Sequence, residues 1–266
     1  MTRFTIAALL GLMSVARAAS ADWPQDGGNA QRTGWTAEEP ELPWKFAWTW
    51  NGPGTQGSAD DHRYHQPQPH EPWEARAVCG GGMVFAPAGE LGLFTLRIAD
   101  GSVAWRFEGA VCHVSPAFDA ESGELFVGAA ESAVMRLRAS EGAELGRCDV
   151  GAPVTKSLLL AGGRVLALTK PGVLHSIEPR TMKRAWQYSA GSAAATPAAW
   201  SARAGCVVFC TDDLHVHCVD ANSGALRWKV RPSPLATRNG AHSVEFTGGW
   251  PVVAEQRGIV FVRLAH

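Results

Sequence analysis

Short runs in which apolar and polar residues alternate fill most of the chain. One set of such runs is separated by turns rich in Gly, Asp and Ser: Val114–Phe118, Glu124–Gly128, Ala133–Arg138 and Leu145–Val150. A second set lies further along: Thr196–Ser201, Gly205–Thr211, Leu214–Asp220 and Ala225–Arg231. Alternation with a period of two residues predicts half-buried strands of an antiparallel sheet. The pattern therefore predicts an all-β fold.

The strands recur as parts of a larger unit. Each unit is marked by a turn residue and, four positions later, by a tryptophan or the residue in its place: Gly101 and Trp105, Gly142 and Gly146, Met182 and Trp186, and Gly224 and Trp228. The tryptophan positions are 41, 40 and 42 residues apart. One such unit cannot bury both of its faces alone, whereas units stacked around an axis can. The period predicts a β-propeller of four-stranded antiparallel blades, in which the site of Gly146 should accept a tryptophan.

The predicted propeller domain covers residues 44–266. Its repeats are expected at about 73–110, 111–151, 152–191, 192–234 and 235–266. The last repeat shows only three candidate strands: His242–Thr247, Trp250–Ala254 and Ile259–Leu264. Residues 44–50 resemble the outer strand of the other units, so one interpretation is a ring of about five blades closed by this N-terminal strand. The other is a fragment of a seven- or eight-bladed array, and the sequence favours neither.

The N-terminus differs in kind from the rest of the chain. Arg3 precedes an apolar stretch, Phe4–Val15, and small residues follow up to Ala21. These features predict a secretory signal peptide at residues 1–21, cleaved near Ala21, ahead of a connecting segment at residues 22–43. The other interpretation of the stretch is a membrane anchor. No cysteine for a lipoprotein anchor lies near the cleavage point, and no later run is long enough for an integral membrane span. We therefore expect a periplasmic or secreted protein.

Charge and cysteine content narrow the classes of function. The chain has 24 basic and 25 acidic residues without a long basic block, so nucleic acid is not an expected partner. Its six cysteines include no C-x-x-C pair, which leaves zinc ribbons and thioredoxin-like chemistry unsupported. Cys206 and Cys210 share one face of a predicted strand, and Cys218 lies in the next strand. This spacing allows one disulfide to Cys218 or a set of buried free thiols.

The best-preserved repeat marker runs from Cys218 to Trp228. It resembles the motif Ala-x-Asp-x-x-Thr-Gly-x-x-x-Trp of the PQQ (pyrroloquinoline quinone) repeat family, within the quinoprotein alcohol dehydrogenase-like superfamily of propellers. Asp22–Gln25 and Thr33–Trp35 also look like the N-terminal segment of secreted bacterial members. Other residues replace the motif's aspartate in the remaining units: Arg97, Arg138 and Glu178. The resemblance implies that a tryptophan wedges between adjacent blades, with these docking residues: Gly101, Trp105, Gly142, Trp186, Gly224 and Trp228.

Catalytic members of that superfamily carry, by the same resemblance, an adjacent Cys-Cys pair, ligands for calcium and a catalytic aspartate. This chain has no Cys-Cys dipeptide and no acid cluster for a calcium ion. We therefore predict no catalytic residue, cofactor or metal. The expected function is an exported non-catalytic scaffold or binding module that resembles outer-membrane-assembly propellers, with a protein or an unknown small ligand as partner. The alternative is a PQQ-dependent oxidoreductase, or a degenerate remnant of one, that binds PQQ with calcium.

Two long irregular segments, residues 51–72 and 232–241, carry the candidate binding groups. Loops on a rigid scaffold are where binding groups concentrate, and both segments are expected on one face of the propeller. The candidates are His62, Arg63, Tyr64, His65, His70, Arg238, Asn239 and His242. Three histidines so close in sequence are also compatible with a transition-metal site. A Pro-rich polar stretch is equally typical of a plain surface loop, so all three interpretations stay open.

Overall fold

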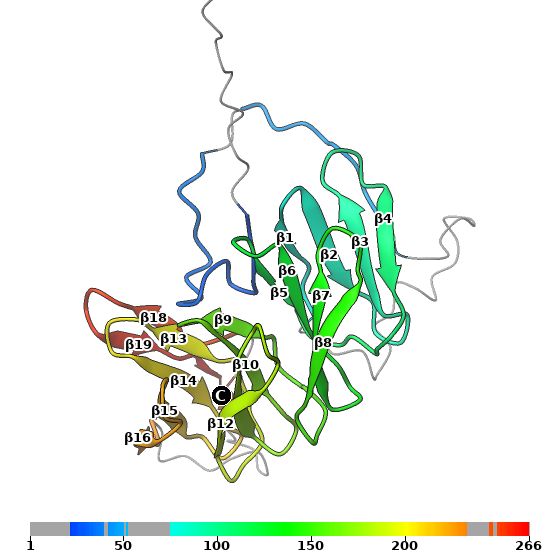
Figure 1. The fold of residues 1–266 in the computed structure, drawn as a ribbon. Coiled ribbons are helices and arrows are strands. Elements are labelled where there is room, and N and C mark those ends of the chain that lie inside the picture. Colours follow the sequence, from blue (N-terminus) through cyan, green and yellow to red (C-terminus); the bar gives the residue numbers. More distant parts are fainter. Residues whose placement is uncertain are drawn as a thin grey trace, which may run out of the picture.

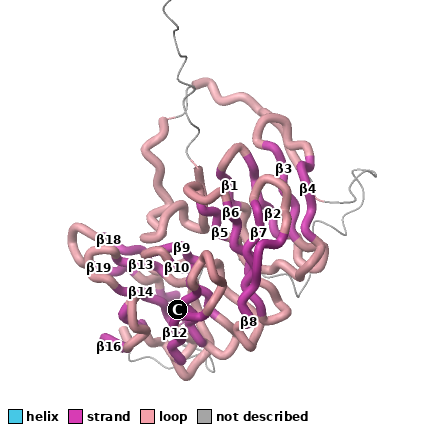
Figure 2. Tube along the Cα trace, in the orientation of Figure 1, coloured by secondary structure: helices cyan, strands magenta, loops and turns pink. Residues whose placement is uncertain are grey.

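The computed structural model describes residues 22–39, 42–50, 52, 75–232, 245–246 and 249–265. Short strands joined by turns and loops make up this part of the chain (Figures 1 and 2). It contains no helix that is long and apolar enough to cross a membrane. The protein is therefore all-β, as the alternating pattern predicts.

Four consecutive sheets share one design, in which four antiparallel strands are hydrogen-bonded in chain order. The first blade contains β1 (Val78–Gly80), β2 (Met83–Pro87), β3 (Leu93–Arg97) and β4 (Val103–Phe107). The second contains β5 (Ala117–Asp119), β6 (Glu124–Gly128), β7 (Ala133–Arg138) and β8 (Glu144–Asp149). The third contains β9 (Leu159–Ala161), β10 (Arg164–Leu168), β11 (Val173–Ile177) and β12 (Arg184–Ser189). The fourth contains β13 (Ala199–Ser201), β14 (Cys206–Cys210), β15 (Val216–Asp220) and β16 (Leu226–Val230). The fold is a β-propeller of four-stranded blades.

The last unit consists of two short strand pairs among the described residues. They are β18 (Val252–Ala254) with β19 (Ile259–Phe261), and β17 (Glu245–Phe246) with β20 (Leu264–Ala265). β18 packs beside β13, the first strand of the fourth blade, so it is the first strand of its own unit. The sequence pattern places residues 250–254 second in that unit, and the structure corrects this order. A period of two identifies a strand but does not say which place it takes in a blade.

Residues 42–50 follow an extended path without ladder pairing to any described strand, and they lie against the first blade. The indole Nε1 of Trp48 donates to the carbonyl of Ile98 (2.7 Å), and the ring of Trp50 lies 5.3 Å from that of Phe94. In Figure 1 the first blade and the β18–β19 hairpin stand at opposite ends of an open arc. Within the described residues, residues 44–50 pair with no strand of the last unit, and closure of a five-bladed ring by them stays a prediction.

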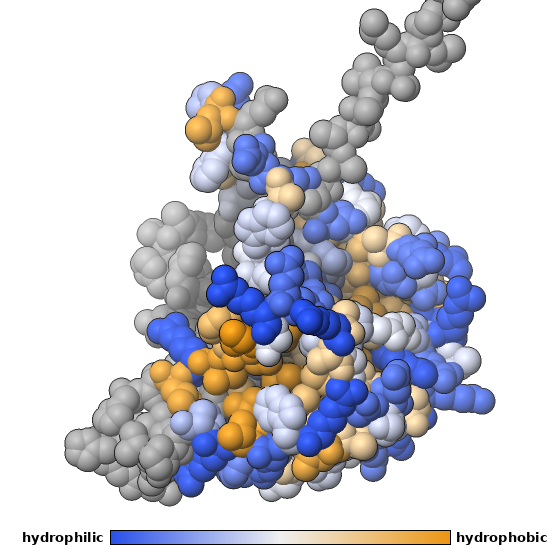
Figure 3. All heavy atoms as spheres, turned by 90° about the vertical axis from the view of Figure 1, so that its left-hand side faces the viewer, coloured by the Kyte–Doolittle hydropathy of each residue, from blue (hydrophilic) through white to orange (hydrophobic). Residues whose placement is uncertain are grey.

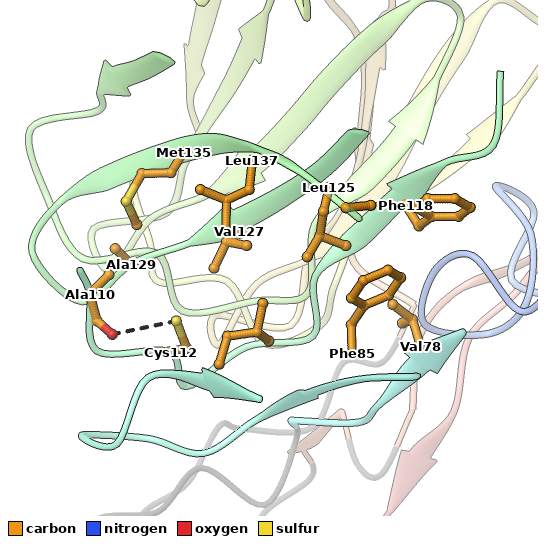
Figure 4. Packing of buried hydrophobic residues seen from close by; sticks show 12 residues of the cluster. Val78, Phe85, Ala110, Cys112, Phe118, Leu125, Val127, Ala129, Met135 and Leu137 are labelled. Atoms are coloured by element: carbon orange, nitrogen blue, oxygen red, sulfur yellow. Dashed lines mark hydrogen bonds between the residues drawn. The ribbon is translucent and has the colours of Figure 1, made fainter. Parts of the chain in front are cut away.

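The apolar core lies in layers between neighbouring blades. Leu125 and Val127 of β6 belong to the layer shared with the first blade, whereas Phe126 belongs to the layer shared with the third, and all three are fully buried. Figure 4 shows the first of these layers, in which the ring of Phe85 stacks on that of Phe118 at 5.5 Å. Because both faces of a blade are covered, every residue of β14 is buried. This packing fixes the positions of the turns and of the strands that face the axis.

Candidate functional site

The loop residues that the sequence nominates for binding all lie outside the described residues: His62, Arg63, Tyr64, His65, His70, Arg238, Asn239 and His242. Their placement on one face, and a metal site among the histidines, therefore stay predictions. Chemistry within the described residues is concentrated in three other places. These are the contacts between blades, the propeller axis, and a polar network between the third and fourth blades.

Tryptophans dock on the glycine turns of the following blade in a repeated geometry. The indole Nε1 of Trp105 donates to the carbonyl of Ala139 (3.0 Å), and a Cβ added at Gly142 would lie 2.5 Å from the ring. Trp186 repeats this with Ala221 (3.1 Å) and Gly224, whose Cβ would lie 2.7 Å from the ring. Trp48 makes the same two contacts with Ile98 and Gly101: a donated hydrogen bond and ring packing on the glycine. The turn residues must be glycine because the indole occupies the space of a side chain.

The second blade replaces this tryptophan by an arginine that comes from a neighbouring strand. Gly146 stands at the tryptophan position, and the guanidinium of Arg136 instead donates to the carbonyls of Pro179 (3.1 Å) and Arg180 (2.7 Å). Pro179 lies three residues before the turn residue Met182, as Ala139 and Ala221 lie three residues before their glycines. Met182 fills the remaining space, since its Cγ lies 3.2 Å from a Cβ added at Gly146. At the contact between the second and third blades, Gly146 and Met182 thus replace the tryptophan and the glycine of the other contacts, and Arg136 makes the hydrogen bonds.

Trp228 of β16 lacks an equivalent glycine turn among the described residues. Its side chain is 42% exposed, and four further apolar side chains on β16 and β19 are also exposed: Leu226, Val230, Ile259 and Phe261. Figure 3 shows apolar side chains gathered on the face of the molecule that carries the β18–β19 hairpin. Large apolar side chains left exposed on a folded domain are common at interaction surfaces. We call this group the β16–β19 apolar surface.

The axis of the arc is filled by residues 22–34, which we call the axial segment (dark blue in Figure 1). Its backbone pairs with β1 at Cys79 and accepts from the backbone amide of Phe118 in β5 through Pro24 (2.7 Å). The side chain of Gln25 exchanges hydrogen bonds with Leu160 in β9. Further along, carbonyls of the axial segment accept from the first strands of the fourth blade and the last unit: Ala30 from Trp200 (2.9 Å) and Gln31 from Val253 (3.0 Å). The segment therefore covers the inner edge of every unit.

Arg32 lies fully buried at the centre of this segment and is held by one carboxylate and several carbonyls. Its Nη1 lies 3.6 Å from Oδ2 of Asp26, and its Nε donates to the carbonyl of Ala198. Asp26 also accepts a hydrogen bond from the hydroxyl of Ser157 (2.9 Å). Burial lowers the pKa of Arg32 to about 10, and the charge of Asp26 opposes this shift, so the guanidinium stays protonated at neutral pH. The axis thus holds a buried ion pair, with a hydrogen bond from Arg32 to the backbone carbonyl of Asp26.

Arg76 links this ion pair to the two ends of the arc. It lies two residues before β1, and its Nη1 lies 3.0 Å from Oδ1 of Asp26. Its guanidinium carbon lies 4.6 Å from the ring centroid of Trp250, which lies two residues before β18 and donates through Nε1 to the carbonyl of Arg32 (2.7 Å). A cation over the face of a tryptophan ring is an attractive contact. Asp26 therefore faces two guanidinium groups and has no oxygen left for a ligand.

A second polar network lies between the third and fourth blades. His217 is fully buried and stacks on Phe209, with ring centroids 5.1 Å apart. Its two nitrogens meet the hydroxyls of Tyr188 and Thr211, each at 3.0 Å, and Thr211 donates to Asp213. Burial lowers the pKa of His217 to about 4, so the ring is neutral at physiological pH. The third blade repeats part of the arrangement with His175 and Thr169, which indicates a structural role in the repeat.

A partly open cavity of about 510 Å³ lies between the first and second blades. Its walls include the rings of Phe85 and Phe118, and its rim includes Gly81, Ser122 and Ser140. Cavities of this size with apolar walls and few polar groups are able to hold small ligands. Glu124 and Arg138 also line the cavity, and they form ion pairs with Arg136 and Glu141, so a neutral ligand suits it better than a charged one.

Among the described residues, the axis offers no open set of oxygen ligands of the kind that PQQ with calcium needs. Such a pair needs open space and several free oxygen ligands. The axial segment fills the centre of the arc, and both oxygens of Asp26 are engaged by guanidinium and hydroxyl groups. Within residues 75–232 and the other described ranges, no group of three or more His, Cys, Asp or Glu side chains is placed to hold a metal.

These features define a class of protein, a repeat propeller whose blades are joined by tryptophan docking. Residues 96–264, more than half of the chain, match the PQQ-repeat family model described as outer membrane protein assembly factor BamB. The chain belongs to this family. No curated protein sequence matches it.

Solved structures with a similar fold come from both enzymes and assembly factors. Quinohemoprotein alcohol dehydrogenase from Comamonas testosteroni is 14% identical, with a TM-score of 0.64 over 94% of this chain and 46% of that one. BamB from Moraxella catarrhalis is also 14% identical, with a TM-score of 0.54 over 72% of this chain and 63% of that one. Quinohemoprotein alcohol dehydrogenase ADHIIG from Pseudomonas putida HK5 is 13% identical, with a TM-score of 0.59 over 92% and 44%. The chain spans about half the length of these proteins, and the likeness shows the fold alone.

Sequence reasoning missed the axial ion pair and the substitution by Arg136. The segment containing Asp26 and Arg32 is polar and rich in glycine, which is typical of a solvated loop. Arg136 lies at a polar position of a strand with a regular alternating pattern, where a solvent-exposed side chain is expected. The one signal available was the loss of the tryptophan at Gly146, which implies that another group occupies its place.

Proposed function

We propose that this protein is an exported, non-catalytic propeller that binds a protein partner, in the manner that the family description, outer membrane protein assembly factor, implies. One observation carries the proposal. The axis is filled by the axial segment and its ion pair, whereas several large apolar side chains are exposed on β16 of the fourth blade and β19 of the last unit. The chemistry available to a ligand therefore lies on an outer surface and not in a central pocket.

The β16–β19 apolar surface is the proposed contact region. Trp228 and Val230 project from β16, and Phe261, 57% exposed, projects from β19. Aromatic side chains that are buried on binding contribute strongly to protein–protein affinity. This surface suits a partner that presents an extended, apolar polypeptide segment. An outer-membrane protein before it folds is a partner of this kind. The predicted signal peptide at residues 1–21 supports export to the compartment in which such segments occur.

A binding measurement with a defined probe tests the proposal. The mature protein is titrated into a fluorescently labelled outer-membrane protein that has just been diluted from urea, and anisotropy reports binding. The variant Trp228→Ser with Phe261→Ser should bind about tenfold or more weakly, which corresponds to about 1.4 kcal/mol or more. The matched control is Leu91→Ser, which changes a similarly exposed leucine on the first blade and should bind like the wild type. Equal binding by the double variant, or no binding by the wild type, would overturn the proposal.

The enzymatic alternative is separated by a second measurement on the same sample. The dehydrogenase structures cover more than nine-tenths of this chain, which is why PQQ needs a direct test. PQQ and Ca²⁺ are added together, and difference absorbance and dye-linked alcohol oxidation are recorded. The proposed function predicts no stoichiometric spectral change and no oxidation above the rate with PQQ alone. A saturable spectral change with turnover would favour the oxidoreductase.

A further inference from the structure

The loop that receives a docked tryptophan has a defined backbone geometry. In the second blade it consists of residues 139–142, between β7 and β8. The amide of Gly142 donates to the carbonyl of Arg138 (2.8 Å), and the amide of Arg138 donates to the carbonyl of Ala143 (2.8 Å). The carbonyl of Ala139, the first loop residue, accepts the indole hydrogen bond, and the ring packs on Gly142, the fourth. The receptor for the tryptophan is therefore a β-hairpin loop that ends in glycine.

The same loop recurs in the first and fourth blades. Gly101 receives Trp48, and Gly224 receives Trp186. The amide of each glycine closes its loop on the carbonyl four residues earlier, at 2.9 Å in both blades. In all three loops the indole hydrogen bond goes to the carbonyl three residues before the glycine. Three contacts thus define what the tryptophan of an outer strand packs against in this protein.

Trp228 takes the same place on β16 and faces the last unit. It lies opposite Cys218 in the β15–β16 ladder, as Trp186 lies opposite Ser176 in the third blade. Residues that lie directly opposite each other share a face of the sheet. Cys218 belongs to the apolar cluster on which the last unit packs, so Trp228 is on the face that meets this unit. Its side chain nevertheless stays exposed.

The described strands of the last unit take the two inner places of a blade. β18 packs beside β13, and β19 pairs with β18. In each of the four complete blades, the receiving loop or turn joins the third strand to the fourth. Among the described residues, no strand takes these two places in the last unit, and β19 has a ladder partner on one side alone. An unpaired strand edge is a template for a further strand.

We propose that a β-hairpin of the partner protein completes the last unit, with its strands in the third and fourth places and with a glycine-ended loop that receives Trp228. This inference rests on the proposed function. An outer-membrane protein before it folds supplies such hairpins, because its antiparallel strands alternate in hydrophobicity and are joined by short turns. Glycine in the loop gives selectivity, since at the other contacts the indole occupies the space of a side chain.

The hairpin would bury apolar surface as well as form hydrogen bonds. Val230 lies opposite Val216 in the β15–β16 ladder, so it shares the face of Trp228, and it is also exposed. The apolar side chains of the hairpin would cover both residues, while its first strand pairs with β19. Trp228 would then have both contacts that Trp186 has in the third blade: a carbonyl acceptor for Nε1 and a glycine under the ring.

Titration with a defined hairpin tests the inference. The probe is a cyclised peptide with two short strands in which valine and threonine alternate, joined by the loop Ala-Asn-Ser-Gly of residues 221–224. It is added to the mature, ¹⁵N-labelled protein, and the Nε1–H signal of Trp228 is identified by its loss in Trp228→Phe. We expect a saturable downfield shift of this signal, because the indole gains a hydrogen-bond acceptor. The amides of β19 should become protected from hydrogen exchange.

Matched changes in the probe and the protein separate loop docking from plain apolar contact, with affinities read by calorimetry. Asparagine in place of the loop glycine tolerates the left-handed conformation but adds a side chain under the indole, so binding should weaken about tenfold or more. Trp228→Phe keeps an apolar ring without a donor, so it should bind the glycine hairpin about fivefold more weakly. Val103→Ser is the control, because it changes a similarly exposed residue on β4 of the first blade, and it should bind like the wild type.

Three results would overturn the inference in a protein that circular dichroism shows to be folded. They are no binding of the glycine hairpin, equal affinity for the glycine and asparagine hairpins, and binding that leaves the indole signal of Trp228 unshifted. The last result would place the hairpin on another strand edge. If the unfolded outer-membrane protein still binds in these cases, the proposed function stands without the inference. Glycine-dependent binding of the hairpin without binding of the outer-membrane protein would overturn the proposed function alone.

Discussion

Replacing Gly224 by alanine tests the docking of tryptophans on glycine turns most directly. Gly224 has a φ of 74°, and an added Cβ would lie 2.7 Å from Cε3 of Trp186. The indole cannot easily move away, because its Nε1 is bound to the carbonyl of Ala221 in the same turn. The left-handed conformation costs an alanine about 1–2 kcal/mol, and overpacking adds about 1–3 kcal/mol. Gly224→Ala should therefore destabilise the protein by about 2–5 kcal/mol.

Gly151→Ala separates the two contributions. Gly151 has almost the same φ, 75°, but nothing lies within 4 Å of its added Cβ. Only the backbone cost applies there, so this variant should lose about 1–2 kcal/mol. The difference between the two glycine variants then measures the contact with the indole of Trp186.

A double-mutant cycle with Trp186→Ala completes the test. Removal of the ring should by itself cost about 3–5 kcal/mol, but it also frees the space that an alanine at position 224 needs. The two changes should therefore be non-additive by about 1–3 kcal/mol in favour of the double variant. Urea unfolding followed by far-ultraviolet circular dichroism gives these free energies without relying on tryptophan fluorescence. Equal losses for Gly224→Ala and Gly151→Ala, or an additive cycle, would refute tight docking at this contact.

Three further predictions concern the axis, the exposed tryptophan and the buried histidine. Asp26→Ala leaves the buried guanidinium of Arg32 unpaired and should cost about 3–5 kcal/mol in urea unfolding; a loss below about 1 kcal/mol would contradict the ion pair. Trp228→Ala should cost about 1–3 kcal/mol less than Trp186→Ala, because Trp228 is 42% exposed and meets no glycine turn among the described residues. The pKa of His217 is lowered from 6.5 to about 4, so the unfolded chain binds the proton more readily, and the melting temperature should fall as the pH drops from about 6.5 to 4. His217→Gln should flatten this pH dependence, and an unchanged slope would show that another group causes it.

The strands of the middle blades could be predicted because the alternation of apolar and polar residues is visible within each short stretch of sequence. β6 and β7 begin and end where the alternating runs Glu124–Gly128 and Ala133–Arg138 do. The first strands are shorter than expected, since β5 (Ala117–Asp119) begins three residues after the start of the run Val114–Phe118. These strands lie at the axis, where residues before them turn away to reach the preceding blade. Alternation marks apolar spacing but not the point at which ladder hydrogen bonding begins.

The axial ion pair could not be predicted because it depends on contacts between distant residues. Asp26 and Arg32 are six residues apart, but their partners Ser157 and Ala198 belong to the third and fourth blades. A charged residue in a glycine-rich stretch normally faces solvent, where it needs no partner. Only after the blades assemble around the axial segment do their carbonyls and hydroxyls surround the guanidinium. Burial of a charge is favourable only with such a complete set of partners, and that set is a property of the assembled propeller.

The contact between the second and third blades corrects the expectation that Gly146 would accept a tryptophan. Compared with the other repeats, Gly146 looks like a position that has lost its tryptophan side chain and left space for one. In the structure, Met182 occupies the turn that should be glycine, and Arg136 binds the carbonyl that should receive an indole. A tryptophan at position 146 would collide with both. The feature that repeats in this propeller is therefore the interface, made of one residue set from each of two blades, and at this contact both sets differ from those of the other blades.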